Sequence, residues 1–208
     1  MPDKKARIAV LVSGGGTNLQ ALLDAQENGT LASGEIVLVI SNKSGVFALE
    51  RARRAGVPAM TVLKSGPDGR EAFERSLTAA LEEARADLII LAGFLAILSP
   101  RFTEHFAGRI INVHPSLIPA FCGEGYYGLK VHESALARGV RITGATVHFV
   151  NEIPDGGEII LQKAVRIRPG DTPERLQRRV MRQAEWKILP AAAEMLCAKI
   201  IEEKEKEH

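Results

Sequence analysis

The stretch RIAVLVSGGGTNLQALLDAQENG (residues 7–29) joins an apolar run to a helical pattern through three consecutive glycines. The continuous apolar run at 7–13 is typical of a strand that is buried on both faces, as in a parallel sheet. The glycines allow a tight turn, and a helical pattern then begins near Asn18. A buried strand followed at once by a helix is half of a βαβ unit, so this stretch predicts an α/β fold.

The same alternation of apolar runs and helical patterns continues along the chain. Further buried strands are predicted at 35–41, 58–64, 87–94 and 109–114, and further helices at 46–56, 69–86 and 130–139. Short connections and right-handed crossovers then give a doubly wound, mostly parallel sheet of Rossmann-like type. After residue 140, two alternating segments at 143–150 and 158–167 predict an antiparallel pair at the sheet edge. A final helical run begins at Thr172, and we expect Pro190 to interrupt it.

The composition is that of an ordinary globular domain. Of 208 residues, 46% are hydrophobic and 25% are charged, which suits one domain spanning 1–208. The net charge of +2 comes from basic residues scattered among acidic ones, which argues against a nucleic-acid partner. No apolar stretch reaches the roughly 20 residues needed to cross a bilayer, and the N-terminus does not fit a secretory signal. We therefore expect a cytoplasmic protein, monomer or homodimer, with no membrane or nucleic-acid partner.

The glycine loop SGGGTNLQ (13–20) follows the first strand and opens the first helix, where backbone N–H groups favour an anion. A dinucleotide fingerprint would need glycine in place of Leu19 and a carboxylate after the second strand, where the chain has SNKSG (41–45). A P-loop would need a lysine that this loop lacks. Two interpretations remain: a phosphate monoester bound by the loop amides and the Thr17 hydroxyl, or a tight structural turn.

A second candidate site lies in IINVHPSLIPAF (110–121), where Asn112 and His114 end a predicted buried strand. Alternate residues of a strand share a face, and ligands of doubly wound sheets bind at the carboxyl ends of the strands. The later loop NEIPDGG supplies Asp155, which could orient the imidazole and raise its pKa. An oxyanion donor, an acid/base and an orienting carboxylate suit acyl transfer by direct attack of a substrate amine. The alternative is a buried histidine with a purely structural role.

The remaining cysteines and histidines predict no metal site. Cys122 lies eight residues after His114 and could be a nucleophile, but no basic neighbour is evident, which favours a plain loop thiol. The other cysteine completes neither a disulfide framework nor zinc spacing. The other histidines show no metal-ligand spacing: His105, His132, His148 and His208.

Several segments, in this order, resemble the phosphoribosylglycinamide formyltransferase family: SGGGTNLQ, SNK, LAGFLAILSP, INVHPSLIPAF, TGATVHFV, DGGEIILQ and GDTPERL. The resemblance runs from about residue 6 to 190. It implies transfer of a formyl group from 10-formyltetrahydrofolate, a co-substrate, to the amine of 5′-phosphoribosylglycinamide in de novo purine biosynthesis, without a metal. It also implies a phosphate-binding half at about 1–105 and a folate and catalytic half at about 106–208.

The resemblance implies roles for particular residues. The family's catalytic trio corresponds to Asn112, His114 and Asp155. In this family the asparagine stabilises the oxyanion and the histidine transfers protons. The aspartate raises the histidine pKa and positions a water. The ribonucleotide-binding positions are Gly16, Thr17 and Asn18 for the phosphate and Glu185 for the ribose. The folate-binding positions are Arg70, Leu95, Ala96, Ile97, Leu98, Asn112, Asn151, Glu152, Ile153, Pro154 and Asp155.

Three departures from the family pattern and two alternative functions accompany this resemblance. Many relatives have arginine where Ala96 stands, the segment FCGEGYYGLKVH (121–132) is longer than usual, and the spacing from Gly170 to Glu185 is one residue longer. One alternative is a formyltetrahydrofolate deformylase, although such proteins usually carry an N-terminal regulatory domain and this sequence begins at the first strand. The other is a non-catalytic module that binds folate or phosphate.

Overall fold

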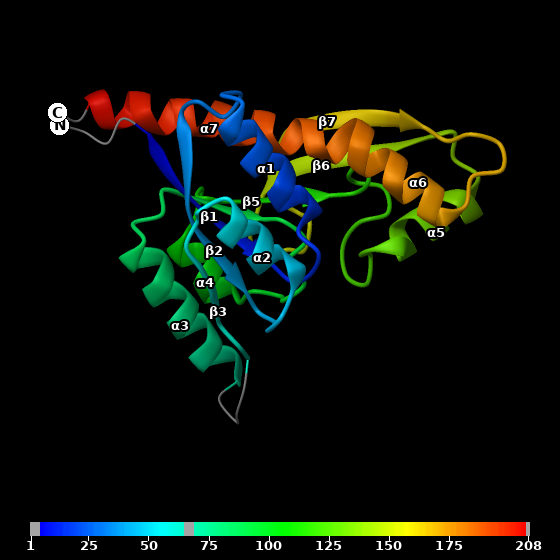
Figure 1. Cartoon of the computed structure of the whole chain (residues 1–208). Coiled ribbons are helices and arrows are strands. Elements are labelled where there is room, and N and C mark those ends of the chain that lie inside the picture. The colour runs from blue at the N-terminus through cyan, green and yellow to red at the C-terminus, as the bar shows by residue number, and fades with distance from the viewer. Residues whose placement is uncertain (1–4, 65–68, 207–208) are drawn as a thin grey trace.

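A computed structural model describes residues 5–64 and 69–206, so His208 and the two ends of the predicted domain lie outside the described residues. A seven-stranded sheet has the order β3-β2-β1-β4-β5-β6-β7 (Figure 1). The strands are β1 (Ala6–Val12), β2 (Gly34–Ser41), β3 (Ala59–Thr61), β4 (Leu88–Leu91), β5 (Ile110–His114), β6 (Ile142–Phe149) and β7 (Ile159–Arg166). The helices are α1 (Thr17–Glu27), α2 (Phe47–Arg54), α3 (Gly69–Glu83), α4 (Pro100–His105), α5 (Leu129–Arg138), α6 (Pro173–Val180) and α7 (Trp186–Lys206).

The sheet is parallel from β3 to β5 and antiparallel at β5-β6-β7. The chain runs outward in one direction from β1 to β3 and in the other from β4 to β5, so the order reverses between β1 and β4. In sheets of this kind, ligands bind beside that reversal, at the carboxyl ends of the strands. The predicted doubly wound sheet with an antiparallel pair at its edge is confirmed.

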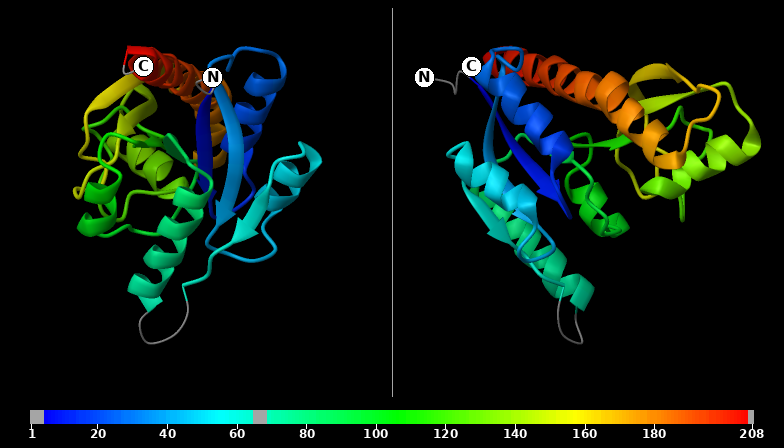
Figure 2. Two further views of the ribbon diagram at one scale, coloured as in Figure 1. Left: turned by 90° about the vertical axis from the view of Figure 1, so that its left-hand side faces the viewer. Right: turned by 45° about the vertical axis from the view of Figure 1, so that its right-hand side comes forward.

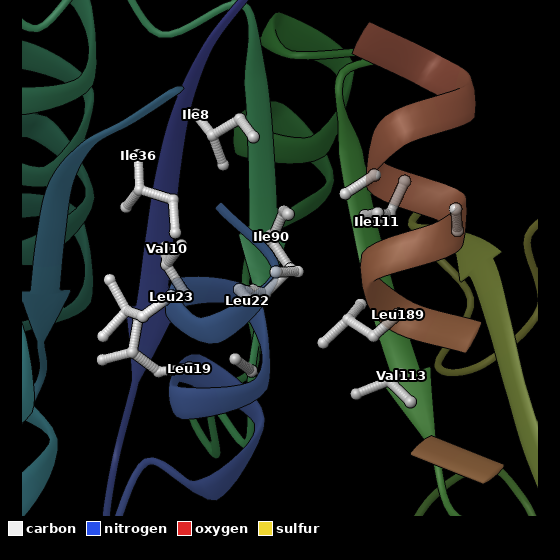
Figure 3. Close-up of a cluster of buried hydrophobic side chains, with 14 of the residues drawn as sticks. Ile8, Val10, Leu19, Leu22, Leu23, Ile36, Ile90, Ile111, Val113 and Leu189 are labelled. Carbon is white, nitrogen blue, oxygen red and sulfur yellow. The ribbon is translucent and has the colours of Figure 1, made fainter. Parts of the chain in front are cut away.

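Two layers of helices cover the sheet because strand side chains alternate between its faces. Val10, Ile90 and Ile111 from three strands pack with Leu22 of α1 and Leu189 of α7 (Figure 3). The opposite face, covered by α3 and α4, holds Ala9, Leu11, Ile89, Phe73, Leu77 and Phe102. Each fully buried aliphatic side chain contributes roughly 1.5–3 kcal/mol. The α5 and α6 helices contact each other at the end of the molecule that lies to the right in Figure 1 and in the right-hand view of Figure 2.

The C-terminal helical run differs from the prediction. Pro190 lies inside α7 without ending it, and the irregularity is a π-helical turn at Met181–Glu185. A proline removes one intrahelical hydrogen bond and can kink a helix rather than terminate it. No helix in the described parts of the chain is long and apolar enough to cross a membrane.

The strand predicted at 87–94 is shorter than expected. It ends at Leu91, and Gly93 adopts a positive φ of 72°, so the chain turns out of the sheet. A short helix that the sequence pattern did not reveal, α4, follows with Ser99 as its N-cap, accepting from the Phe102 amide. Residues 92–99 thereby form a loop at the carboxyl end of β4, beside the point where the strand order reverses.

Candidate active site

A cleft of about 580 Å³ opens at the carboxyl ends of the central strands. Its walls come from the α1 N-terminus, the loop after β4, the end of β5 and the loop 123–128. A smaller hollow of about 140 Å³ adjoins it, lined by the loops 96–98 and 150–155. Asn112 and Asp155 line both spaces. The two hollows thus offer places for two ligands that meet at this pair of residues.

Both candidate side chains of β5 reach the cleft, as their spacing predicted. Asn112 pairs with Leu91 of β4 in the parallel register, which places it where β4 leaves the sheet. His114 is only 4% exposed, and its Nε2 lies 2.9 Å from the carbonyl oxygen of Phe121. A carbonyl can only accept, so Nε2 carries the hydrogen of the neutral imidazole. Nδ1 is therefore the atom left to exchange a proton.

Asp155 meets His114 from the other side of the cleft, as predicted. Its carboxylate lies 3.4 Å from Nδ1 of His114 and accepts from the backbone N–H of Gly123 at 2.9 Å. Burial would raise the pKa of Asp155, but its interactions with His148, His114 and that N–H together lower the pKa below its ordinary value. The residue has a positive φ of 56°, an uncommon conformation outside glycine. A fixed negative charge therefore stands beside the imidazole at neutral pH.

Asp155 raises the pKa of His114, as predicted, yet the net pKa of His114 is lower than its ordinary value. Burial lowers the pKa, and this outweighs the opposite effects of Asp155 and of the Phe121 carbonyl. Desolvation penalises the charged imidazolium more than one carboxylate at 3.4 Å favours it. The lowered pKa favours the neutral imidazole at pH 7, with the negative charge of Asp155 beside it.

A histidine that the sequence reasoning passed over, His148 of β6, completes the group. Its Nδ1 donates to the Phe149 carbonyl at 2.7 Å, and its Nε2 lies 3.2 Å from Nδ2 of Asn112. The same Nε2 lies 3.5 Å from Asp155. This contact fixes which end of the Asn112 amide faces inward and leaves its second N–H for a ligand. Only the register that pairs Asn112 with His148 reveals the contact.

The glycine loop is built as an uncapped helix start. Gly16 is the N-cap of α1 with φ 73°, and no side chain caps the helix. A Cβ at Gly16 would lie 2.6 Å from the Cβ of Ala48, so only glycine fits there without a shift. Thr17 and Asn18 line the cleft, whereas Gly16 supports them from behind. Free amides at a helix N-terminus suit an anion such as phosphate.

Glu185 lies in the cleft wall beside the glycine loop. It is buried and accepts a hydrogen bond of 2.8 Å from Nδ2 of Asn18, although 167 positions separate the two residues. Burial raises the pKa of Glu185 to about 7, against the lowering effect of the Asn18 hydrogen bond. The π-helical turn at Met181–Glu185 holds one residue more than an α turn. Glu185 is the last residue of this turn and lines the cleft.

We expect Glu185→Gln to change how stability depends on pH. A carboxyl with a folded pKa of about 7 and an ordinary value of 4.5 contributes stability below pH 4.5 that is lost as the pH rises through 7. Between pH 5 and pH 8, wild type should lose on the order of 2–3 kcal/mol more unfolding free energy than the variant. Urea denaturation at the two pH values measures this. Parallel pH dependence in the two proteins would contradict a raised pKa.

Most of the predicted folate positions line the smaller hollow. The loop 95–98 is held by the Leu95 amide, which donates to the Ser13 hydroxyl at 2.8 Å, and the side chains of Leu95 and Ile97 are exposed. Ala96, Ile97 and Leu98 line the hollow, as do all five residues of 151–155. Arg70 does not line it: its guanidinium donates to the Ile97 carbonyl at 3.0 Å and braces the loop from outside.

Cys122 and His132 lie near the cleft with different surroundings. The Cys122 thiol donates to the Pro119 carbonyl, and burial, together with Asp155, raises its pKa, which disfavours the nucleophilic thiolate. His132 lines the cleft, is fully buried and has no partner for either ring nitrogen; burial and His114 lower its pKa to about 4. Within residues 5–64 and 69–206, no three His, Cys, Asp or Glu side chains are grouped to hold a metal ion.

The chain is similar to known proteins over most of its length. The formyl transferase family matches residues 6–193. The phosphoribosylglycinamide formyltransferase of Escherichia coli (strain K12) is 44% identical over 176 residues, covering 85% of this chain and 80% of that protein. The crystal structure of glycinamide ribonucleotide transformylase 1 from Symbiobacterium toebii has a TM-score of 0.87 at 41% identity, covering 94% of this chain and 89% of that one.

A longer relative shares the same region. The trifunctional purine biosynthetic protein adenosine-3 of Bos taurus is 46% identical over 196 residues, which is 94% of this chain. The chain spans 19% of the length of that protein. From the family match, the shared fold and the two relatives, we conclude that this chain belongs to the formyl transferase family.

Proposed function

We propose that this protein transfers the formyl group of 10-formyltetrahydrofolate to the amine of 5′-phosphoribosylglycinamide, a step of de novo purine biosynthesis. The observation that carries the proposal is the meeting of Asn112, His114 and Asp155 where two adjoining hollows touch. A transferase with two substrates needs such a place, since the reacting atoms must come within about 3–3.5 Å. The names of the relatives support the choice of substrates.

The ribonucleotide fits the larger cleft with its phosphate at the glycine loop and its amine toward Asn112. Its phosphate is bound by the amides of Gly16 to Asn18 and the hydroxyl of Thr17, at the positive end of α1. Glu185 faces the same end of the cleft, and its carboxylate accepts hydrogen bonds from the ribose hydroxyls. The glycinamide amine then extends toward Asn112 and Asp155, at the other end.

The folate fits the smaller hollow and the rim that joins it to the cleft. The pterin lies between the backbone of 95–98 and the loop 151–155, where apolar side chains line the hollow together with polar ones such as Asn112 and Asn151. Because Ala96 is small, it contributes backbone contacts rather than a charged side chain. Arg70 acts here by holding the 95–98 loop through the Ile97 carbonyl.

The reaction proceeds by direct attack of the amine on the formyl carbon. The N–H of Asn112 that does not contact His148 stabilises the developing oxyanion. His114 takes a proton from the amine at Nδ1, and the negative charge of Asp155 stabilises the imidazolium. When the bond between the formyl carbon and N10 breaks, the same proton passes to N10 and tetrahydrofolate leaves. No bond to the protein forms at any stage.

An assay with both substrates tests the proposal. Incubation with 10-formyltetrahydrofolate and glycinamide ribonucleotide should release tetrahydrofolate, and omission of the ribonucleotide should stop the release. Release that continues unchanged without the ribonucleotide would instead identify a deformylase. Absence of turnover together with binding of folate would identify a non-catalytic module. Cys122→Ser serves as the control and should retain wild-type activity, because the thiol takes no part.

A further inference from the structure

The carbonyl groups of the three glycines in the glycine loop all accept hydrogen bonds from other parts of the protein. The Gly14 carbonyl accepts from the backbone N–H of Ala48 at 3.2 Å, and the Gly16 carbonyl accepts from the backbone N–H of Gln20 at 2.9 Å. Between them, the Gly15 carbonyl accepts from Nε of Arg51 at 2.8 Å. Two of these contacts come from backbone groups that any residue supplies, whereas the middle contact depends on one side chain.

These contacts decide where the loop amides point. In a trans peptide the C=O and the following N–H point in opposite directions. Carbonyls held toward α2 at Gly14 and Gly15 therefore turn the N–H groups of Gly15 and Gly16 away from α2. The Gly16 carbonyl, held within α1, likewise turns the Thr17 N–H out of the helix start. Thr17 lines the cleft, so this is the side on which an anion would be bound.

Arg51 is itself held in a fixed orientation. Its Nη1 donates to Oε1 of Gln20 at 2.8 Å, and the Gln20 amide donates in turn to Asp24 at 2.7 Å. Its guanidinium also lies over the ring of Phe47, 4.7 Å from the centroid. Two directed hydrogen bonds and a stacked ring fix a planar guanidinium in a way that lysine cannot reproduce.

We propose that Arg51 is a positioning residue for the phosphate site: it holds the Gly15 peptide so that the following amide faces the phosphate. The inference rests on the proposed function for the identity of the ligand, but not for the orientation of the loop. Glycine is the residue whose peptide turns most easily, because both signs of φ are open to it. Without Arg51, the Gly15–Gly16 peptide can rotate and present the Gly15 carbonyl to the anion. The partial negative charge of that carbonyl oxygen then repels the anion. The positive charge behind the loop adds to the effect.

Arg54 provides a matched control on the same helix. Its guanidinium also lies over Phe47, 5.6 Å from the centroid, but it pairs with Glu50 at 2.9 Å and is exposed. Arg54→Met and Arg51→Met thus both remove one positive charge and one contact with Phe47 from α2. Only Arg51→Met removes the hydrogen bond to the Gly15 carbonyl.

Isothermal titration of ribose 5-phosphate and glycinamide ribonucleotide, without folate, tests the inference independently of catalysis. We expect Arg51→Met to raise Kd for both compounds by about ten- to a hundredfold, because one charge-assisted hydrogen bond is lost. Arg54→Met should change Kd by less than twofold, and Arg51→Lys should fall between Arg51→Met and wild type. In turnover, Arg51→Met should raise KM for the ribonucleotide while kcat and the folate KM change less than threefold.

The outcomes separate the inference from the proposed function. Wild type that binds the phosphorylated compounds without formyl transfer overturns the function, while the ratio of Kd values still decides the role of Arg51. Equal Kd values for Arg51→Met and Arg54→Met overturn the inference even when formyl transfer is observed, as does failure of wild type to bind either compound. Should Arg51→Met not fold, Gln20→Met removes the partner that orients Arg51 and should raise Kd about two- to fivefold.

Discussion

Replacing Asp155 with asparagine should lower kcat for formyl transfer by about 10³-fold, within the range for loss of a group that supports proton transfer. Asparagine has nearly the same shape but no charge, so it cannot stabilise the imidazolium that forms on His114, 3.4 Å away. Steady-state kinetics of purified Asp155→Asn against wild type, at saturating concentrations of both substrates, measures the effect.

Glu158→Gln is the control for this experiment. Glu158 follows the same loop, is exposed and lines neither the cleft nor the smaller hollow, so loss of its charge should change kcat less than threefold. The affinity of Asp155→Asn for ribose 5-phosphate should match that of wild type, since the phosphate site lies at the other end of the cleft. A loss below tenfold for Asp155→Asn would remove the carboxylate from the mechanism.

Asn112→Ala should lower kcat on the order of 10²–10³-fold, the cost of one lost oxyanion donor. The effect should fall on kcat rather than on KM, because the second N–H of the amide is used only when charge develops on the formyl oxygen. The thermal unfolding of wild type and of Asn112→Ala should be measured beside the kinetics, because Asn112 also contacts His148 at 3.2 Å and its loss could destabilise the fold. A reduction of less than tenfold in a folded variant would contradict the assigned role.

The alternation of side chains along buried strands made most of the fold predictable. Val10 packs in one helical layer and its neighbours Ala9 and Leu11 in the other, as a strand covered on both faces requires. The two-residue spacing of Asn112 and His114 likewise predicted a shared site at the end of β5. Both inferences depend only on local geometry, which the sequence determines directly.

Long-range contacts could not be inferred in the same way. His148 meets Asn112 through the antiparallel register of β5 and β6, and Arg51 meets Gly15 through the packing of α2 against the loop. Neither contact can be read from a local pattern, because each joins segments that are far apart in the sequence. The π turn that contains Glu185 was also hidden, since a single π turn has no signature in a helical pattern.

The pKa of His114 shows a second property that could not be predicted from the sequence. The carboxylate partner was identified from sequence, and its effect on the pKa has the expected direction. The depth at which His114 is buried depends on the whole fold, and burial contributes more than the partner does. The sequence thus indicates which groups interact, whereas the balance between desolvation and charge requires the three-dimensional structure.

A rapid-quench single turnover with 10-formyltetrahydrofolate labelled in the formyl group tests the central claim most directly. With enzyme in excess and glycinamide ribonucleotide present, the label should pass entirely to the ribonucleotide, at one equivalent per tetrahydrofolate released. No label should be found on the protein or in formate at any time. Label that first appears on the protein, at Cys122 or elsewhere, or that is released as formate, would contradict direct transfer in this cleft.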